Sequence, residues 1–407
     1  MRKYLILIVF LVSSTVLFAQ VDSVRLGYSV QGTVVDAASG RPMESVHVSV
    51  PDRHYATVTN ADGGFTIKSD QPVTEVVFSY MGYRTQSLRP TGQALRVRML
   101  SESLTLEEAS IITGDPYEIV RAAIDKIPDR FSRQPELLEC FYRETVRKRN
   151  RYIYVSEAVA RMYKTGYDGT VYRDRTALEK SRVLLSQRKA DTLSVKVQGG
   201  PTQAMTFDVV KNFEILFDKE EMALYEFEMG MPTYINDRLQ FVIRFRPGYR
   251  QVDWALYNGT LYIDGELLSF TRFEMSLDMS DISKATRMMV IRKPLMLRLT
   301  PRELSVVINY RLQDGKSRLS YFRSTMRFNC DWRKRLFATS YAAVNELVVT
   351  DVREPAVPIA RADAFRTIDI LSDKAAEFLD PDYWKDYNII EPTESLENAI
   401  GRLRKGR

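Results

Sequence analysis

The sequence of 407 residues contains only two histidines and two cysteines. Two cysteines exclude a disulfide-dense scaffold and a zinc module with four cysteine ligands. Both histidines, His47 and His54, lie near the N-terminus, so the rest of the chain cannot build a Ser-His-Asp triad. The sequence also has no Gly-x-x-x-x-Gly-Lys loop, Gly-x-Ser-x-Gly elbow or Cys-x-x-Cys pair. We therefore expect a non-enzymatic protein with no catalytic residues, no cofactor and no metal site.

Long apolar runs are equally scarce, and the clearest one lies at the N-terminus. Residues 5–12 are apolar throughout and follow the positively charged Arg2 and Lys3. The run is shorter than the ~20 residues of a membrane-spanning helix, and Ala19 suits the position before a signal peptidase cut. We predict a signal peptide at residues 1–19, with a retained anchor as the alternative. The mature chain should have no transmembrane helix and be exported, either periplasmic or associated with the outer membrane.

Neither sign of charge dominates the sequence. The formal net charge of +6 is a small excess of 58 basic over 52 acidic residues. Such an excess does not by itself indicate nucleic acid, and export makes nucleic acid a poor partner. The expected partner is another protein of the cell envelope, with a lipid or a glycan as alternatives.

Export also bears on Cys140 and Cys330. An oxidising compartment allows the two thiols to form a disulfide, which would close a long loop. The alternative is that both are small buried hydrophobic residues, because Cys330 shares a strand face with Met326 and Phe328. The sequence leaves both interpretations open.

Residues 27–102 consist of short apolar runs separated by turn signals. Val46, Val48 and Val50 alternate with polar residues, and residues 60–64 (Asn-Ala-Asp-Gly-Gly) form a strong turn signal. About seven short strands at this spacing predict a β-sandwich. His47 is opposite in phase to the three valines, so we expect it on the solvent side, and we place His54 in a loop.

The same residues carry a resemblance. The chain resembles the carboxypeptidase regulatory-like domain, a transthyretin-like sandwich, at Gly32-x-Val34-x-Asp36, Gly40-x-Pro42, Val46, Thr59-x-x-x-Gly63-x-Phe65 and Tyr80-x-Gly82-Tyr83. The resemblance implies an accessory, non-catalytic domain of the kind found on exported proteins of Bacteroidetes. A zinc carboxypeptidase would need a His-x-x-Glu pair, but Val50 and Thr57 stand three residues after the histidines, so peptidase activity is rejected.

The sequence predicts a linker and a helix at residues 103–135, in which Asp115 is the N-cap, Pro116 is the first helical residue and Pro128 ends the helix.

For residues 136–407 the sequence predicts a large antiparallel β-rich domain with a few flanking helices, because apolar and polar residues alternate along long runs. The hairpin turns are expected at Asn258-Gly259, Asp264-Gly265 and Asp314-Gly315. Helical stretches are expected at residues 207–217, 373–378 and 395–403. The fold class is thus mainly β, a sandwich followed by an α+β domain.

The whole arrangement resembles a Bacteroidetes family of exported proteins, in which the same sandwich precedes a domain of unknown function. The stretches that carry this resemblance are residues 122–128, 141–144, 156–159, 259–264 and 384–392. The resemblance implies no reaction. Larger relatives continue into an outer-membrane barrel, and this sequence ends at Arg407.

Three hypotheses for the function stay open. The leading one is a non-enzymatic envelope protein that acts as an interaction or scaffold module. The second is a carrier of lipid or lipoprotein, which requires an apolar cavity rather than a face filled by Tyr and Phe. The third is a glycan-binding or carbohydrate-active protein. It would need convergent carboxylates, for which Asp264, Glu266, Asp278 and Asp281 are candidates by residue type alone.

Two surface patterns have competing interpretations. The basic run at residues 143–151 flanks a predicted hairpin, and either protects a solvated sheet edge or binds an acidic surface. Five tyrosines follow, and they form either a surface for stacking sugars or cross-strand aromatic pairs: Tyr152, Tyr154, Tyr163, Tyr167 and Tyr172.

Overall fold

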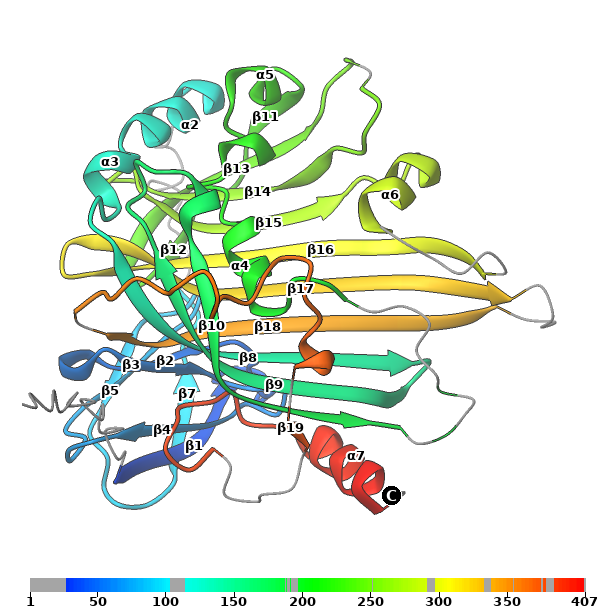
Figure 1. Cartoon of the computed structure of the whole chain (residues 1–407). Helices are drawn as coiled ribbons and strands as arrows, with labels where there is room; N and C mark the ends of the chain where they lie inside the picture. Colours follow the sequence, from blue (N-terminus) through cyan, green and yellow to red (C-terminus); the bar gives the residue numbers. More distant parts are fainter. Residues whose placement is uncertain are drawn as a thin grey trace, which may run out of the picture.

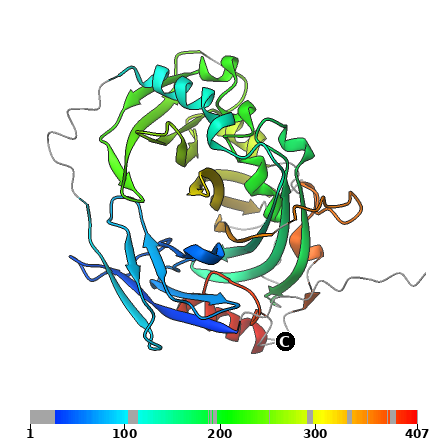
Figure 2. The same cartoon turned by 90° about the vertical axis from the view of Figure 1, so that its left-hand side faces the viewer.

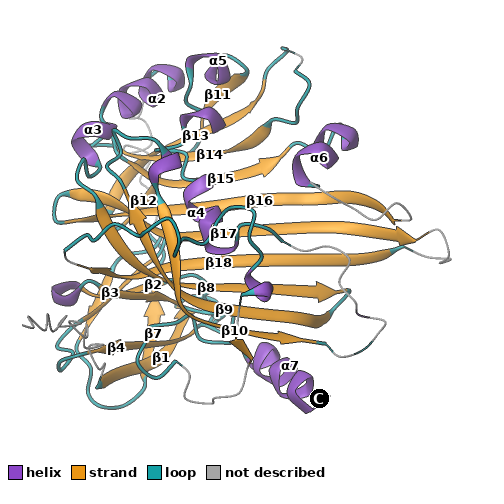
Figure 3. Ribbon diagram, in the orientation of Figure 1, coloured by secondary structure: helices purple, strands orange, loops and turns teal. Residues whose placement is uncertain are grey.

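The computed structural model describes residues 27–102, 114–186, 188, 191, 197–250, 252–290, 297–332, 338–353, 355–374, 376–377 and 384–405. The predicted signal peptide and most of the predicted linker lie outside these residues. Figures 1 and 3 show a mainly β protein, as predicted, with a small N-terminal sandwich and one large sheet that carries helices.

The sandwich contains the seven predicted strands, in two sheets with the orders β4-β1-β7 and β3-β2-β5-β6. Its elements are β1 (Tyr28–Asp36), β2 (His47–Val50), the 3₁₀ turn η1 (Pro51–Arg53), β3 (Tyr55–Val58), β4 (Gly64–Ser69), β5 (Val76–Ser79), β6 (Gln86–Leu88) and β7 (Leu95–Met99). Alternate side chains from both sheets, among them Val48 and Phe78, form its core. Gly63 is required in the turn, since it has a φ of 74° and a Cβ there would lie 2.4 Å from the Val34 carbonyl oxygen.

The large sheet has twelve strands in the order β11-β13-β14-β15-β16-β17-β18-β8-β9-β10-β19, with β12 paired to β13. Its strands are β8 (Glu136–Lys148), β9 (Arg151–Lys164), β10 (Arg175–Leu185), β11 (Tyr225–Met229), β12 (Thr233–Ile235), β13 (Arg238–Pro247), β14 (Tyr257–Asp264), β15 (Phe270–Leu277), β16 (Leu297–Gln313), β17 (Lys316–Trp332), β18 (Thr339–Arg353) and β19 (Ala376–Glu377). All pairings are antiparallel except that of β10 with β19.

Two of the three predicted hairpin turns are confirmed. Asp314 and Gly315 join β16 to β17 with φ angles of 52° and 73°, the left-handed pair that a tight hairpin needs. Asp264-Gly265 begins the turn between β14 and β15. The prediction for Asn258-Gly259 is wrong, because both residues lie inside β14. Gly259 is there for close packing, since a Cβ would lie 2.1 Å from the Glu274 carbonyl oxygen.

Most of the short helices cover one face of the large sheet, which we call the core face and which carries Phe273, Ile308 and Phe322. The helices and 3₁₀ turns are α2 (Pro116–Asp125), α3 (Ile127–Arg130), η2 (Val171–Arg173), η4 (Gly200–Thr202), α4 (Gln203–Thr206), η5 (Phe213–Ile215), α5 (Lys219–Met222), α6 (Ile282–Met289), η6 (Leu371–Asp373) and α7 (Glu394–Lys405). The core is therefore the layer between this face and α2 to α5.

The structure confirms some of the predicted helices and not others. The side chain of Asp115 caps α2 by accepting from the Tyr117 N–H, as expected. Pro128 does not stop this helix, since α2 ends at Asp125 and Pro128 lies in the first turn of α3. The helix predicted at residues 373–378 is wrong, because Ala376–Glu377 forms a strand beside β10. The helix predicted at residues 395–403 is confirmed as α7.

The sandwich and the C-terminal part of the chain lie over the other face of the large sheet. Figure 2 shows the sandwich (blue) at the lower left with α7 (red) beside it, far from helices α2 and α3 (cyan) at the top. We call this second face the polar face. It carries Ser305, Thr325 and Glu346. The sandwich contacts the sheet where β3 packs against β18 and where the Gly82 N–H donates to the Tyr234 carbonyl of β12, and polar contacts such as Glu44 with Arg323 add to these.

Cys140 and Cys330 are both buried and unpaired. Cys140 lies opposite Val349 of β18, whereas Cys330 lies opposite Thr339 of the same strand. Ten residues of strand separate these positions, roughly 33 Å. The disulfide that the sequence left open does not form in this structure. Among the described residues, no helix is long and apolar enough to cross a membrane.

A candidate binding groove between the sandwich and the sheet

The core face is filled by the side chains of the chain itself. Ring contacts link the segments next to the helices to the sheet, for example Phe217 with Phe270 of β15 at 4.9 Å and Phe131 with Tyr310 of β16 at 5.4 Å between centroids. Phe207 stacks on Phe322 in the same layer. Where the structure describes this layer, aromatic side chains occupy the space that an apolar ligand would need.

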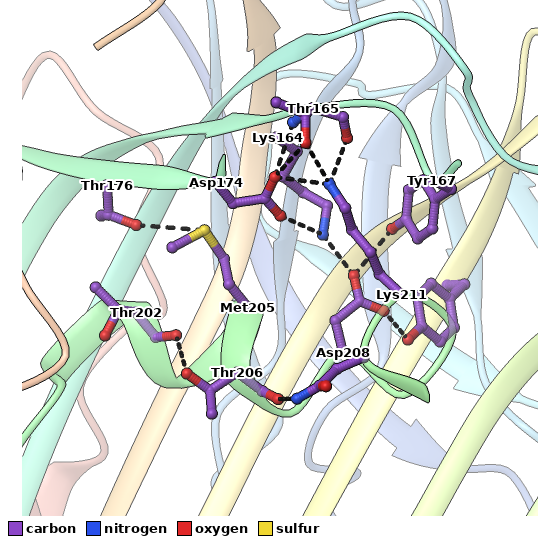
Figure 4. A network of polar contacts seen from close by, with 12 residues as sticks. Lys164, Thr165, Tyr167, Asp174, Thr176, Thr202, Met205, Thr206, Asp208 and Lys211 are labelled. Carbon is purple, nitrogen blue, oxygen red and sulfur yellow. Dashed lines mark hydrogen bonds and ion pairs between the residues drawn. The ribbon is translucent and has the colours of Figure 1, made fainter. Parts of the chain in front are cut away.

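A buried polar network holds the segment after α4 against the sheet, as Figure 4 shows. Asp208 forms an ion pair with Lys164 and accepts hydrogen bonds from the hydroxyls of Tyr167 (3.1 Å) and Tyr310 (2.5 Å). Lys211 pairs with a second buried carboxylate, Asp174, at 2.6 Å.

Burial and the carboxylates of Asp208 and Asp174 shift the pKa of Lys164 in opposite directions. Burial would lower the pKa of this ammonium, but Asp208 and Asp174 hold it above its ordinary value. Burial and the charge of Asp208 raise the pKa of Tyr167 and Tyr310 well above the ordinary value, so both hydroxyls stay protonated donors. The two lysines and two aspartates of the network pair with one another, and we assign the network a structural role.

A second polar feature crosses the core face as a row of four buried residues in register on neighbouring strands. Ser324 lies opposite Asn345, Asn345 opposite Glu144, and Glu144 opposite Ser156. The Asn345 amide donates to Ser324 Oγ (2.9 Å) and to Gln203 of α4 (3.2 Å), which ties the helix to the sheet. Burial raises the pKa of Glu144 to about 7, although the Tyr142 hydroxyl donates to it at 3.0 Å.

On the polar face, residues 384–393 (the C-terminal segment) bind both the sandwich and the sheet. Asn388 exchanges two hydrogen bonds with the backbone of Lys68 in β4, at 2.7 and 3.0 Å. The Thr57 hydroxyl donates to the Ile389 carbonyl at 2.6 Å. On the sheet side, Arg143 donates to the Ile390 carbonyl at 2.7 Å. The segment therefore fixes the sandwich against the large sheet.

A buried ion cluster anchors this segment. Glu157 accepts from Arg143 Nε (2.7 Å), Arg182 Nε (2.7 Å) and the indole nitrogen of Trp384 (2.9 Å). Burial would raise the pKa of Glu157, but the two guanidiniums lower it to about 2. The basic run thus does not protect a sheet edge, because β8 and β9 are interior strands and Arg143 is buried.

Between these attachments a groove separates the sandwich from the polar face. It has three compartments, of about 450 Å³ beside the C-terminal segment, about 460 Å³ in the middle and about 60 Å³ at the far end. The first two compartments share Glu44 and Arg323, and the last two share Ser45 and Arg272. Since neighbouring compartments share wall residues, they adjoin and form one groove across the strands.

The charge of the lining changes along the groove. In the first compartment four arginines face four glutamates: Arg143, Arg147, Arg323, Arg327, Glu44, Glu303, Glu346 and Glu391. Most of these charges are paired, for example Arg323 with Glu44 at 2.9 Å across the two domains. The far compartment instead contains Arg272 and Arg311, and its described lining includes no carboxylate. The groove therefore runs from a balanced end to a positive end.

His47 lies at this positive end and not on the solvent side, so our prediction for it is wrong. The reason is that the polar face of the large sheet covers β2, which a strand pattern within the sandwich cannot show. Its Nε2 lies 3.5 Å from Arg311 Nη1, and burial together with Arg311 lowers the pKa of His47 well below its ordinary value. His54 lies after a 3₁₀ turn, in the predicted loop, next to Gln313.

The four candidate carboxylates do not converge. Asp264 accepts from Arg238 at one end of the β14–β15 hairpin, and Glu266 shares that arginine. Asp278 follows β15 at the other end of the hairpin, and Asp281 caps α6 through the N–H groups of Ser283 and Lys284. Seven strand residues separate the two pairs, roughly 23 Å.

The five tyrosines do not form one surface either. Tyr154 and Tyr167 are buried among core residues, whereas Tyr172 is 77% exposed. Tyr152 lines the groove, but the Arg147 guanidinium covers one face of its ring at 4.1 Å, so a sugar cannot stack on that face.

Comparison with known proteins identifies the first domain alone. Residues 30–111 match the family model of the CarboxypepD_reg-like domain, in agreement with the predicted sandwich at residues 27–102. Comparison with curated proteins gives no significant match.

Several solved structures are similar to part of the chain. A LolA superfamily protein from Nitrosomonas europaea is 12% identical over 59% of this chain and 96% of its own, with a TM-score of 0.20. A putative outer membrane lipoprotein-sorting protein domain from Vibrio parahaemolyticus is 12% identical over 61% and 95%, with a TM-score of 0.25. The MucA/MucB complex of Pseudomonas aeruginosa is 14% identical over 61% and 100%, with a TM-score of 0.19. Sequence identities and TM-scores this low do not establish a shared function.

Proposed function

We propose that the protein is a non-enzymatic binding protein of the cell envelope, and that it holds a short polypeptide segment of a partner protein in the groove between its sandwich and its large sheet. The observation that carries this proposal is the groove itself, which has walls from both domains and a floor of polar strand residues. Binding sites commonly lie at domain interfaces. The signal peptide predicted from the sequence supports the envelope location.

The size of the groove suits an extended peptide. From Arg272 on β15 to Arg143 on β8 the groove crosses four strand spacings, roughly 19 Å. An extended chain of five or six residues has this length. Ser305 and Thr325 offer hydroxyl groups along the floor, and charges of both signs flank them. Peptide amides and charged side chains are the groups that such a lining can bind.

A lipid carrier is less well supported. A bound acyl chain needs a continuous apolar lining, but charged and hydroxyl groups interrupt the apolar side chains of this groove, such as Val307, Val344 and Ile390. The apolar core face, for its part, is filled by Phe207, Phe217 and the rings around them. We therefore take the polar face as the binding face.

The proposal can be tested by site-specific photo-crosslinking. A photoreactive amino acid replaces Thr325, on the floor of the first compartment, in the protein expressed in its own envelope. The matched control places it at Ser276, which is exposed, away from this groove. Adducts are identified by mass spectrometry, and the cross-linked segment is made as a synthetic peptide.

The peptide is then titrated into the purified protein. Thr325→Trp fills the floor and should weaken binding at least tenfold, whereas Ser276→Trp should leave the affinity unchanged. Equal affinity for Thr325→Trp and the parent protein, or adducts that form equally from both positions, would refute a peptide site in this groove.

A further inference from the structure

The lining of the far compartment of the groove carries positive charge, which favours the binding of a negatively charged group. Arg272 and Arg311 contribute two positive charges, and no carboxylate stands among those of its lining residues that the structure describes. The other lining groups are hydroxyls, amides and the imidazole of His47, together with the apolar side chains of Met81 and Ile235. Because the pKa of His47 lies well below its ordinary value, the ring is neutral at pH 7 and adds no charge.

Arg311 has no directly paired counter-charge in the part of the chain that the structure describes, although the charge of Asp314 acts on it from a greater distance. Its Nη2 donates to Gln313 Oε1 at 3.0 Å, and its Nη1 lies 3.5 Å from His47 Nε2. Among the described residues it has no carboxylate within 4.0 Å. Arg318, directly opposite on β17, pairs with Glu136 at 2.7 Å, so the two arginines differ in this respect. A guanidinium that is shielded from water ordinarily has a counter-charge.

Arg272 is held in place beside it. Its Nε donates to Glu274 at 2.7 Å and its Nη1 to Asn309 Oδ1 at 2.8 Å. The Glu274 contact neutralises part of its charge, but Glu274 lies outside the lining of this compartment. Ser45 and Ser79 of the sandwich complete the wall with hydroxyl donors. Donors from both domains therefore converge on one small space.

We propose that this pocket binds one small oxyanion, a carboxylate or phosphate group, with Arg311 as the main counter-charge and Arg272 as the second. The volume of about 60 Å³ is enough for roughly four water-sized centres, which suits such an anion and excludes a bulky one. The inference deepens the proposed function, since we take the oxyanion to be the anionic group of the groove's ligand. In a guanidinium site of this kind the anion replaces water and accepts charge-assisted hydrogen bonds.

The test uses the purified mature protein without any partner, so its result does not depend on the peptide experiment. Sodium phosphate and sodium acetate are titrated separately in calorimetry at constant ionic strength. Arg311→Met removes the charge and keeps much of the chain length, and Arg311→Lys keeps the charge. Arg244→Met is the control, because Arg244 is exposed at a distance from this pocket.

We expect saturable binding of at least one anion to the parent protein. Arg311→Met should weaken it about tenfold or more, since hydrogen bonds to charged groups are the strong ones. Arg311→Lys should retain part of the affinity and Arg244→Met all of it. Binding of phosphate alone or acetate alone identifies the anion.

The inference is overturned if neither anion binds saturably, or if Arg311→Met and Arg244→Met bind like the parent. Arg311→Lys serves as the test if Arg311→Met does not fold.

Discussion

Replacing Glu157 by glutamine tests how the C-terminal segment is held. The carboxylate of Glu157 is buried, and it is the shared partner of Arg143, Arg182 and Trp384. Glutamine removes the negative charge and turns one acceptor into a donor, so the two guanidiniums remain buried without compensation. Removing one partner of a buried ion pair lowers the free energy of unfolding by about 3–5 kcal/mol. We therefore expect Glu157→Gln to lower the free energy of unfolding by that amount at pH 7.

The pH dependence gives a second check on the same variant. The pKa of Glu157 is about 2 in the folded protein and 4.5 ordinarily. A lowered carboxyl pKa contributes stability that is present above pH 4.5 and is lost as the pH falls toward 2. The difference between the parent protein and Glu157→Gln should therefore be largest at neutral pH and shrink below pH 4.5.

The assay is chemical denaturation followed by near-ultraviolet circular dichroism, at pH 7 and at pH 3. Glu303→Gln is the control, because Glu303 pairs with Arg327 at 3.1 Å on the surface, where such pairs contribute about 0–1 kcal/mol. Faster tryptic cleavage after Lys385 in Glu157→Gln would show that the C-terminal segment is released. A loss below about 1 kcal/mol, equal to that of the control, would refute the anchoring role.

The other expectations concern the core face. Glu144→Gln should become more stable relative to the parent protein as the pH rises from 4.5 to 7, because burial raises the pKa of Glu144 to about 7 and the ionised form is disfavoured in the fold. The gain should reach about 3 kcal/mol in denaturation midpoints converted to free energy, and a pH-independent difference would contradict it. Asp208→Asn should destabilise by about 3–5 kcal/mol, since Lys164 then stays buried without its nearest counter-charge. Unchanged thermal unfolding of Asp208→Asn would contradict that expectation.

Strands such as β13, β15 and β16 were predictable because each has one apolar and one polar face, whereas β8 and β9 are buried on both faces and lack this alternation. Phe273 and Met275 alternate with polar residues in β15, and both are buried on the core face as the pattern predicts. Turn signals were less reliable. Asp314-Gly315 forms a turn, but Asn258-Gly259 does not, since Gly259 serves close packing against the Glu274 backbone and the Phe245 ring. Local turn propensity contains no information about a neighbouring strand.

The groove was not predictable, and neither was its anchor. Lys148 lies opposite Arg151 at the hairpin turn, and this register alone would place Arg143 opposite Ser156. A β-bulge between Val146 and Arg147 shifts the register by one residue and places Arg143 opposite Glu157 instead. What the sequence does not contain is which layer covers the polar face. Arg311 and His47 both look solvent-exposed within their own strands, and only the docking of the sandwich brings them together.

The way in which the sandwich is attached explains why a groove exists at all. It is fixed at one side through Asn388 and Thr57 and at the other through Gly82, and between these points polar contacts such as Glu44 with Arg323 cross the groove without filling it. Polar strand faces in that interval, such as Ser305 and Thr325, gain nothing from being buried against an apolar partner. A sandwich held at its two margins therefore forms a wall of a site rather than a separate module. It follows that changes in the C-terminal segment should alter ligand binding as strongly as changes in the groove floor, because they move the wall.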